Sequence, residues 1–126
     1  MEHKLFDSEL KVMDTLWKAG GDLSASQIAK ILQEEIGWNR NTTYTVIKKC
    51  IAKGAIERTD PKFQCHALIT RKQVQEYETG ELIDKMFDGS KQKFFAAFLS
   101  DGELTEEELR QLREMVSGLE SRHIRK

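Results

Sequence analysis

Hydrophobic positions recur every three or four residues in the first third of the chain, and this spacing predicts two amphipathic helices. The first follows Ser8, assigned as its N-cap, and ends at Gly20-Gly21. The second opens with Ser24 and Gln27, which form a capping box. It ends at Gly37. The positions assigned to the buried faces are Leu10, Val12, Met13, Leu16 and Trp17 in the first helix and Ala25, Ile28, Ala29, Leu32 and Ile36 in the second.

A third helix is predicted from the cap residue Asn39 through Lys53, closed by Gly54, with Trp38 ahead of it as a packing anchor. Because successive helical residues point 100° apart, its side chains separate into two faces. The inward face holds Thr43, Val46, Ile47, Cys50 and Ile51. The outward face is polar, basic and free of acids; it holds Asn41, Thr45, Lys48 and Ala52, flanked by Thr42, Tyr44 and Lys49.

The pattern changes after Gly54 to two short β-compatible segments, 55–59 and 63–68. Asp60-Pro61-Lys62 between them is a turn signal, so the pair is predicted to form a hairpin. Three short helices followed by a two-stranded hairpin indicate a winged helix-turn-helix, a fold that places its second motif helix in the major groove of DNA.

Three more helices are predicted beyond the hairpin. Their starts are marked by Thr70 with Gln73, by Ser90, and by Thr105 with Glu108. We therefore expect a mainly α protein with two domains: a winged helix-turn-helix head (three helices plus a two-stranded β-hairpin) over residues 1–70 and a three-helix C-terminal dimerisation tail over residues 71–126.

Dimerisation through the tail is expected because three helices of this length bury little surface alone, and a symmetric operator requires a symmetric protein. The residues assigned to the interface are Phe87, Phe94, Phe95, Phe98, Leu99, Leu109, Leu112, Met115 and Val116. The alternative is that Phe94, Phe95 and Phe98 pack onto the head within one chain.

Composition agrees with a folded, helix-rich, soluble chain: 39% of residues are hydrophobic, 33% are charged and one is proline. The first residues lack an apolar signal segment, and no stretch approaches the roughly 18 apolar residues of a membrane span. A cytoplasmic protein with no membrane insertion is expected.

The net charge of −1 argues against a nucleic-acid partner, but the charge is unevenly distributed. Residues 38–72 carry eight Lys or Arg against two acids. Polar groups on the outward face are assigned to base edges and the cations to phosphates of double-stranded operator DNA. The predicted DNA-binding residues are Arg40, Asn41, Thr42, Tyr44, Thr45, Lys48, Lys49, Lys53, Arg58 and Lys62. The alternative is a solvated, unpartnered helix face.

Signatures of other chemistry are missing from the sequence. Cys50 and Cys65 stand alone, outside CxxC pairs, and are assigned to packing in the core and the wing. His3, His66 and His123 lie far apart, so no metal site and no cofactor is expected. No phosphate-binding loop or nucleophile motif appears, so the chain is not expected to be an enzyme. A helical protein-protein interaction module or a metal- or redox-responsive regulator are the alternatives.

Several segments in this order resemble the penicillinase and methicillin-resistance repressors (the BlaI/MecI family), to which copper-transport repressors are related. The resemblance covers almost the whole chain, and its most specific part is the spacing from the third helix to the wing. The matching segments are Glu9-Leu10-Lys11-Val12-Met13 with Trp17, Ser24-Ala25-Ser26-Gln27-Ile28, Asn39-Arg40-Asn41-Thr42-Thr43-Tyr44-Thr45-Val46-Ile47-Lys48-Lys49 and Lys53-Gly54-Ala55-Ile56-Glu57-Arg58.

The resemblance implies a homodimer, joined through the C-terminal helices, that binds palindromic operators with TACA and TGTA half-sites and represses resistance genes. It also implies a membrane sensor-protease system whose response leads to repressor cleavage. The matching bond is Ala97–Phe98, where Ala97 replaces the family's usual Asn. Lys49 and Cys50 replace the family's usual Arg and Leu. The tail lacks the cysteine cluster with which copper-responsive relatives bind Cu(I) or zinc.

Overall fold

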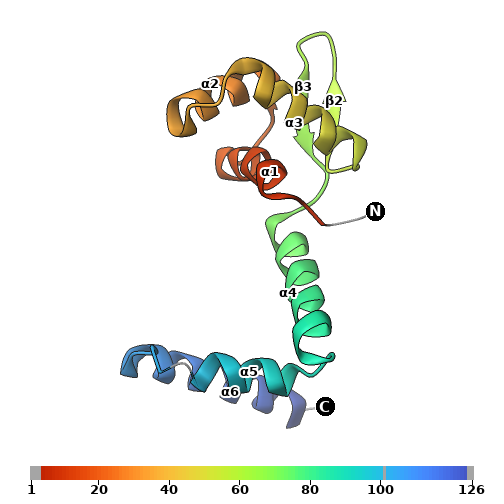
Figure 1. Ribbon diagram of the computed structural model, residues 1–126. Coiled ribbons are helices and arrows are strands. Elements are labelled where there is room, and N and C mark those ends of the chain that lie inside the picture. Colours follow the sequence, from red (N-terminus) through yellow and green to blue (C-terminus); the bar gives the residue numbers. More distant parts are fainter. Residues whose placement is uncertain (1–3, 101, 125–126) are drawn as a thin grey trace. The chain divides into compact units, whose positions relative to one another are not determined.

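The computed structural model describes residues 4–100 and 102–124 (Figure 1). Its contacts divide the chain into two units, Met1–Leu82 and Ile83–Lys126. The predicted boundary at residue 70 coincides with the start of α4 (Arg71–Phe87), and the contacts place the division further along that helix. The first turns of α4 belong with the head because Val74 is buried in the head core.

Three helices build the head around one core: α1 (Asp7–Ala19), α2 (Ala25–Ile36) and α3 (Arg40–Ala52). The capping box predicted for α2 is present, because the Gln27 backbone N–H donates to Ser24 Oγ (3.1 Å) and the Ser24 N–H donates to Gln27 Oε1 (2.8 Å). The core is formed chiefly by Val12, Met13, Leu16, Ile28, Leu32, Val46, Ile47, Cys50, Ile56, Cys65 and Ile69.

The start of α1 differs from the prediction. Its N-cap is Phe6, and Ser8 lies inside the first turn. The Phe6 backbone N–H donates to Glu9 Oε1 (2.8 Å), so a buried carboxylate satisfies the helix end that Ser8 was expected to cap. Two positions assigned to buried faces are also exposed: Leu10 by 40% and Ile36, the last residue of α2, by 42%.

The turn that joins α2 to α3 depends on a glycine. Gly37 adopts φ 74°, a left-handed conformation that side-chain-bearing residues rarely adopt, and its N–H donates to Gln33 O (3.1 Å). Asn39 then accepts the Thr42 N–H (2.8 Å) and caps α3 as predicted. Trp38 packs against the core between them, so the position of α3 relative to α2 is fixed at both ends of a short turn.

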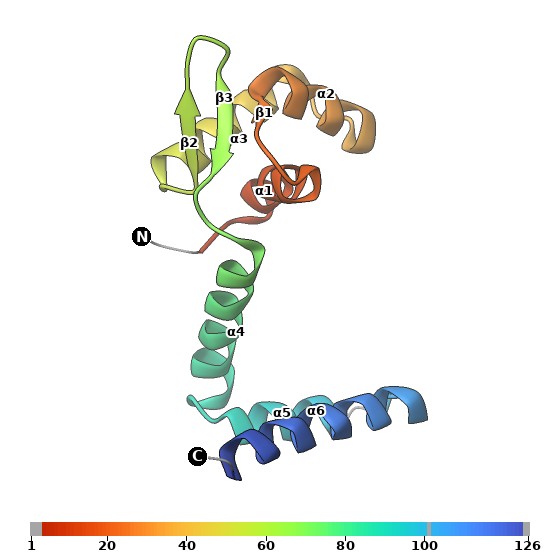
Figure 2. The same ribbon diagram turned by 180° about the vertical axis from the view of Figure 1, so that it is seen from behind.

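The predicted hairpin is present, with β2 (Ile56–Thr59) and β3 (Gln64–Ala67) antiparallel. A two-residue strand that the sequence did not reveal, β1 (Leu23–Ser24), pairs with the other edge of β3, where Leu23 faces Cys65. The resulting order is β1-β3-β2. Figure 2 shows β1 beside the hairpin, leading directly into α2. The wing is therefore hydrogen-bonded to the segment that starts the helix-turn-helix. Together these elements form a winged helix-turn-helix head.

The tail helices are α4, α5 (Lys91–Ser100) and α6 (Glu106–Ile124). Their predicted caps are confirmed: Thr70 Oγ1 accepts from Gln73 N, Ser90 Oγ from Lys93 N, and Thr105 Oγ1 from Glu108 N. No residue of α5 is buried. Within residues 4–100 and 102–124, no helix has both the length and the apolar character needed to span a membrane.

Candidate nucleic-acid interface

The two faces predicted for α3 are present. Thr43, Val46, Ile47 and Cys50 are buried and fix the helix against the head. The outward side chains of Asn41, Thr42, Thr45, Lys48 and Lys49 are exposed. Because no residue of α3 is acidic, this side of the head presents positive charge and hydrogen-bonding groups without a competing carboxylate on the helix.

Arg40 and Tyr44, one turn apart on α3, form a joint unit. The Arg40 guanidinium carbon lies 4.8 Å from the centroid of the Tyr44 ring, and Nη2 donates to the Tyr44 hydroxyl (2.8 Å). Nη1 also lies 3.4 Å from Ser26 Oγ on α2. The tyrosine hydroxyl is the acceptor in this contact, so its own proton is free to be donated to a phosphate or a base-edge oxygen.

The wing places two further predicted cations at its tip. Arg58 on β2 and Lys62 in the turn are both exposed. Arg58 Nε donates to Asp60 Oδ1 (3.0 Å), and its guanidinium carbon lies 3.6 Å from the Phe63 ring centroid. Arg58 is thus held in one place by a neighbouring carboxylate and an aromatic ring.

Lys53, also predicted to contact phosphate, has another role in the structure. Its ammonium donates to Glu9 Oε1 (2.6 Å) and to the Lys4 carbonyl (3.2 Å), and it lies 4.2 Å from the Phe6 ring centroid. The carboxylate of Glu9 is 1% exposed. Lys53 therefore ties the end of α3 to the start of α1. Sequence reasoning missed this pair, whose only signal is an acid among the apolar positions of the first predicted helix.

Both cysteines are buried, as predicted, in the core and under the wing. Burial raises the pKa of the Cys50 thiol to about 12, with the nearby charge of Glu9 adding to the effect. Burial likewise raises the pKa of Cys65 to about 11. Since the thiolate is the metal ligand and the reactive species, neither side chain is suited to sensing metals or oxidants. Among the described residues, no three His, Cys, Asp or Glu side chains are grouped to hold a metal ion.

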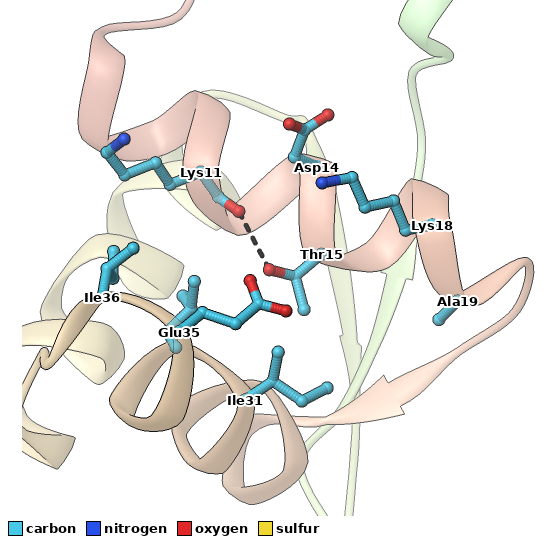
Figure 3. Close-up of a pocket in the computed structure, with 9 residues that line it drawn as sticks. Lys11, Asp14, Thr15, Lys18, Ala19, Ile31, Glu35 and Ile36 are labelled. Atoms are coloured by element: carbon cyan, nitrogen blue, oxygen red, sulfur yellow. Dashed lines mark hydrogen bonds between the residues drawn. The ribbon is translucent and has the colours of Figure 1, made fainter.

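A separate cleft of about 410 Å³ lies between α1 and α2 (Figure 3). Lys11, Lys18 and Glu35 stand around it with Ile31 and Ile36, while the Thr15 hydroxyl donates to the Lys11 carbonyl (3.0 Å). Charges of both signs alternate with apolar side chains, so the lining favours no class of ligand. None of its lining residues belongs to α3 or to the wing.

Comparison with known proteins agrees with this architecture. A family model described as penicillinase repressor matches residues 5–118, which include α1 to α3, the three strands and most of the tail. The chain belongs to the penicillinase repressor family. Methicillin resistance regulatory protein MecI of Mammaliicoccus sciuri and that of Staphylococcus aureus strain N315 are each 25% identical over 122 residues, covering 93% of this chain and 98% of the relative. The penicillinase repressor of Bacillus licheniformis is 23% identical over 115 residues, covering 90% of this chain and 89% of the relative.

The tail of this penicillinase repressor family member exposes many large apolar side chains. Phe87, Phe94 and Leu112 are half-buried, and the Phe94 ring contacts the rings of Phe87 and Phe95 edge-on, with centroids 5.6 and 5.3 Å apart. The remaining residues assigned to the dimer interface are 43–66% exposed in the single chain: Phe95, Phe98, Leu99, Leu109, Met115 and Val116. We refer to these six residues as the exposed tail set. Ala97, next to Phe98 in α5, is exposed as well.

Proposed function

We propose that this chain is a homodimeric transcriptional repressor that binds a palindromic operator by placing α3 in the major groove. The observation that carries the proposal is the outward face of α3, which is exposed, basic and free of acids on a helix whose other face is locked into the head core. A wing with two exposed cations, Arg58 and Lys62, follows α3 along the chain.

The side chains divide into two roles. Asn41, Thr42, Tyr44 and Thr45 are short or planar groups that read base edges and thymine methyls. Cations supply the salt-dependent affinity for phosphates; they are Arg40, Lys48, Lys49, Arg58 and Lys62. Lys53 is left out of this second set because its ammonium already binds a buried carboxylate.

The exposed tail set supports homodimerisation. Isolated soluble chains rarely leave so many large apolar side chains exposed on neighbouring helices, and a two-fold dimer buries the same set from both copies. The same observation supports the second candidate function, a helical module that binds another protein. Duplex binding by the whole chain distinguishes the repressor from the module.

The relatives' names connect them with methicillin resistance and penicillinase. We propose that this chain controls an antibiotic-resistance or stress-response operon, and that a membrane sensor-protease system releases it by cleaving the Ala97–Phe98 bond. Both residues of that bond are exposed in α5. Incubating the DNA-bound protein with a protease of that kind and mapping the fragment ends tests this route; an intact chain would contradict it.

The central test is the salt dependence of duplex binding. Wild-type protein is titrated with a palindromic duplex carrying TACA and TGTA half-sites and with a scrambled duplex of equal length. Lys48→Ala is expected to weaken binding to both and to lower the slope of log K against log salt by about 0.9, the value for one phosphate contact. Asn41→Ala is expected to weaken binding to the palindrome alone.

Arg113→Ala, which removes an exposed positive charge from α6, serves as the matched control and should leave the slope unchanged. If the wild-type chain binds neither duplex while its tail binds another protein, the repressor proposal is wrong and the interaction module is the better description.

A further inference from the structure

Phe63, at the end of the wing turn, is not among the residues that the sequence assigned to DNA binding. We propose that it is a positioning residue for that function: its ring joins the wing cation Arg58 to Tyr44 of α3, so that the two DNA-contacting elements present their charges as one preformed unit. This inference rests on the proposed DNA-binding function and adds to it the residue that couples wing and helix.

The contacts form a continuous chain from α3 to the wing. Arg40 stacks on Tyr44, and the rings of Tyr44 and Phe63 meet edge to face with centroids 5.7 Å apart and planes at 89°. On the wing side of these contacts, the guanidinium carbon of Arg58 lies 3.6 Å from the centroid of the Phe63 ring. An edge-to-face pair places ring hydrogens against a π face, and a cation favours the ring face, so both contacts have a preferred geometry.

The backbone of Phe63 is fixed independently of its ring. Its φ is 48°, in the left-handed region that residues other than glycine rarely occupy, and its carbonyl accepts the N–H of Ala25 (2.9 Å), the first residue of α2. The wing turn is thus attached to the start of the helix-turn-helix at the residue whose ring contacts Tyr44. A strained backbone held by tertiary contacts is common where geometry serves a function.

The advantage for binding is preorganisation. An arginine side chain has several rotatable bonds, and ordering it on a phosphate costs conformational entropy each time the complex forms. Stacking on Phe63 and bonding to Asp60 order Arg58 before DNA arrives, and Tyr44 and Ser26 do the same for Arg40. A ring that only filled space in the core would be replaceable by any apolar side chain of similar volume.

The experiment compares Phe63→Leu, which keeps an apolar side chain and removes the ring, with Phe63→Tyr, which keeps the ring. Duplex affinity and its salt slope are measured for these variants, for Arg58→Ala and for the double variant, on the half-site palindrome and the scrambled duplex. Thermal unfolding of each variant measures any loss of stability separately. The NMR shifts of the Arg58 δ-protons report the stacking without DNA.

We expect Phe63→Leu to weaken binding to both duplexes about 5- to 10-fold and to reduce the salt slope, and Phe63→Tyr to restore both quantities. The double variant should lose less affinity than the sum of the two single losses, because part of the effect of the ring acts through that arginine. The ring-current shift of the Arg58 δ-protons should vanish in Phe63→Leu and persist in Phe63→Tyr.

Losses that add in the double variant, or an unchanged salt slope with only a lower melting temperature, would overturn the positioning role while duplex binding by the wild type stands. Absence of salt-dependent binding by the wild type itself would overturn the proposed function, and the inference with it.

Discussion

The Glu9–Lys53 pair shows how one buried charge shapes the head. The Glu9 carboxylate accepts from the Phe6 backbone N–H and from Lys53 Nζ at 2.8 and 2.6 Å. These two contacts cap α1 and hold the end of α3. The two partners differ in burial, since the Lys53 side chain keeps 23% of its surface exposed and Glu9 keeps 1%. Removing one or the other should therefore have unequal effects.

Lys53→Met is expected to lower the free energy of unfolding by about 3 kcal/mol, because it leaves a buried carboxylate without its counter-charge. Glu9→Gln should cost less, since the Lys53 ammonium can turn toward water. Urea denaturation measures both. Lys62→Met, at an exposed wing lysine, is the control and should change stability by less than about 0.5 kcal/mol. Equal losses of stability in Lys53→Met and Glu9→Gln would contradict the view that the buried carboxylate is the partner that needs its counter-charge.

The pKa of His66 on β3 depends on the carboxylates near the wing. Its Nδ1 lies 2.7 Å from Asp22 Oδ1, and that hydrogen bond and charge hold the pKa of His66 above its ordinary value of 6.5, with a smaller contribution from Glu57. Because the folded pKa exceeds the unfolded one, the stabilisation by this exposed pair is complete below about pH 6.5. It is lost as the pH rises through the folded pKa.

Asp22→Asn is accordingly expected to lower the pKa of His66 toward 6.5. An NMR titration that follows the His66 ring protons measures this pKa. Glu57→Gln should lower the same pKa by less. A larger shift in Glu57→Gln than in Asp22→Asn would show that the recorded hydrogen bond is not the main cause.

At the scale of elements, the helix starts are encoded locally. Asn39 caps α3 by accepting one hydrogen bond from the Thr42 N–H, and the cap also sets where the outward face of α3 begins. Asn39→Ala should reduce the free energy of unfolding by about 1 kcal/mol, whereas Asn39→Asp should retain most of it. Thermal or urea unfolding provides the measurement. Asn41→Ala, two residues on and exposed, is the control; because alanine favours the helix more than asparagine does, a similar loss there would show that the cap hydrogen bond is not the cause.

Local signals explain which elements were predictable. The capping pairs at Ser24, Thr70 and Thr105 mark helix starts within four residues, and the two faces of α3 follow from helical periodicity. Strand β1 was not predicted because two residues are too few to show a periodicity, and because its pairing with β3 joins segments far apart in the sequence. The prediction at Ser8 was wrong for the opposite reason: Ser8 is a good local cap residue, but Glu9 takes that role, and its partners include Lys53, just after the end of α3.

The candidate site divides in the same way. The outward position of Asn41, Thr45 and Lys48 follows from 100° spacing alone, whereas the Arg58–Phe63–Tyr44 contacts depend on the fold of the wing against α3. Lys53 has the right charge next to α3, yet its role depends on the Glu9 carboxylate in α1. The residue types and the order of the elements predicted a basic, polar surface on α3 and the wing. Tertiary contacts determined which of the predicted cations are not already bound to a carboxylate of the head.

At the scale of the whole molecule, the exposed tail set predicts how the chain associates. Phe98→Asp would place a charge in the apolar seam of the proposed dimer and is expected to weaken that dimer by about 3 kcal/mol, or about 100-fold in Kd. Sedimentation equilibrium measures the dissociation constant. Gln92→Asp, an exposed polar position on the same helix, is the matched control. A Phe98→Asp variant as strongly dimeric as the control would place the interface elsewhere.

The two buried thiols have a practical consequence. Cys50 lies on the side of α3 that faces the core and Cys65 lies on β3, and both are fully protonated and shielded at neutral pH. A small electrophile can reach them only during transient openings of the surrounding structure. Labelling rates at the two cysteines, measured separately by mass spectrometry, would thus report how often the structure opens around α3 and around the sheet. No cysteine has to be introduced by mutation for this measurement.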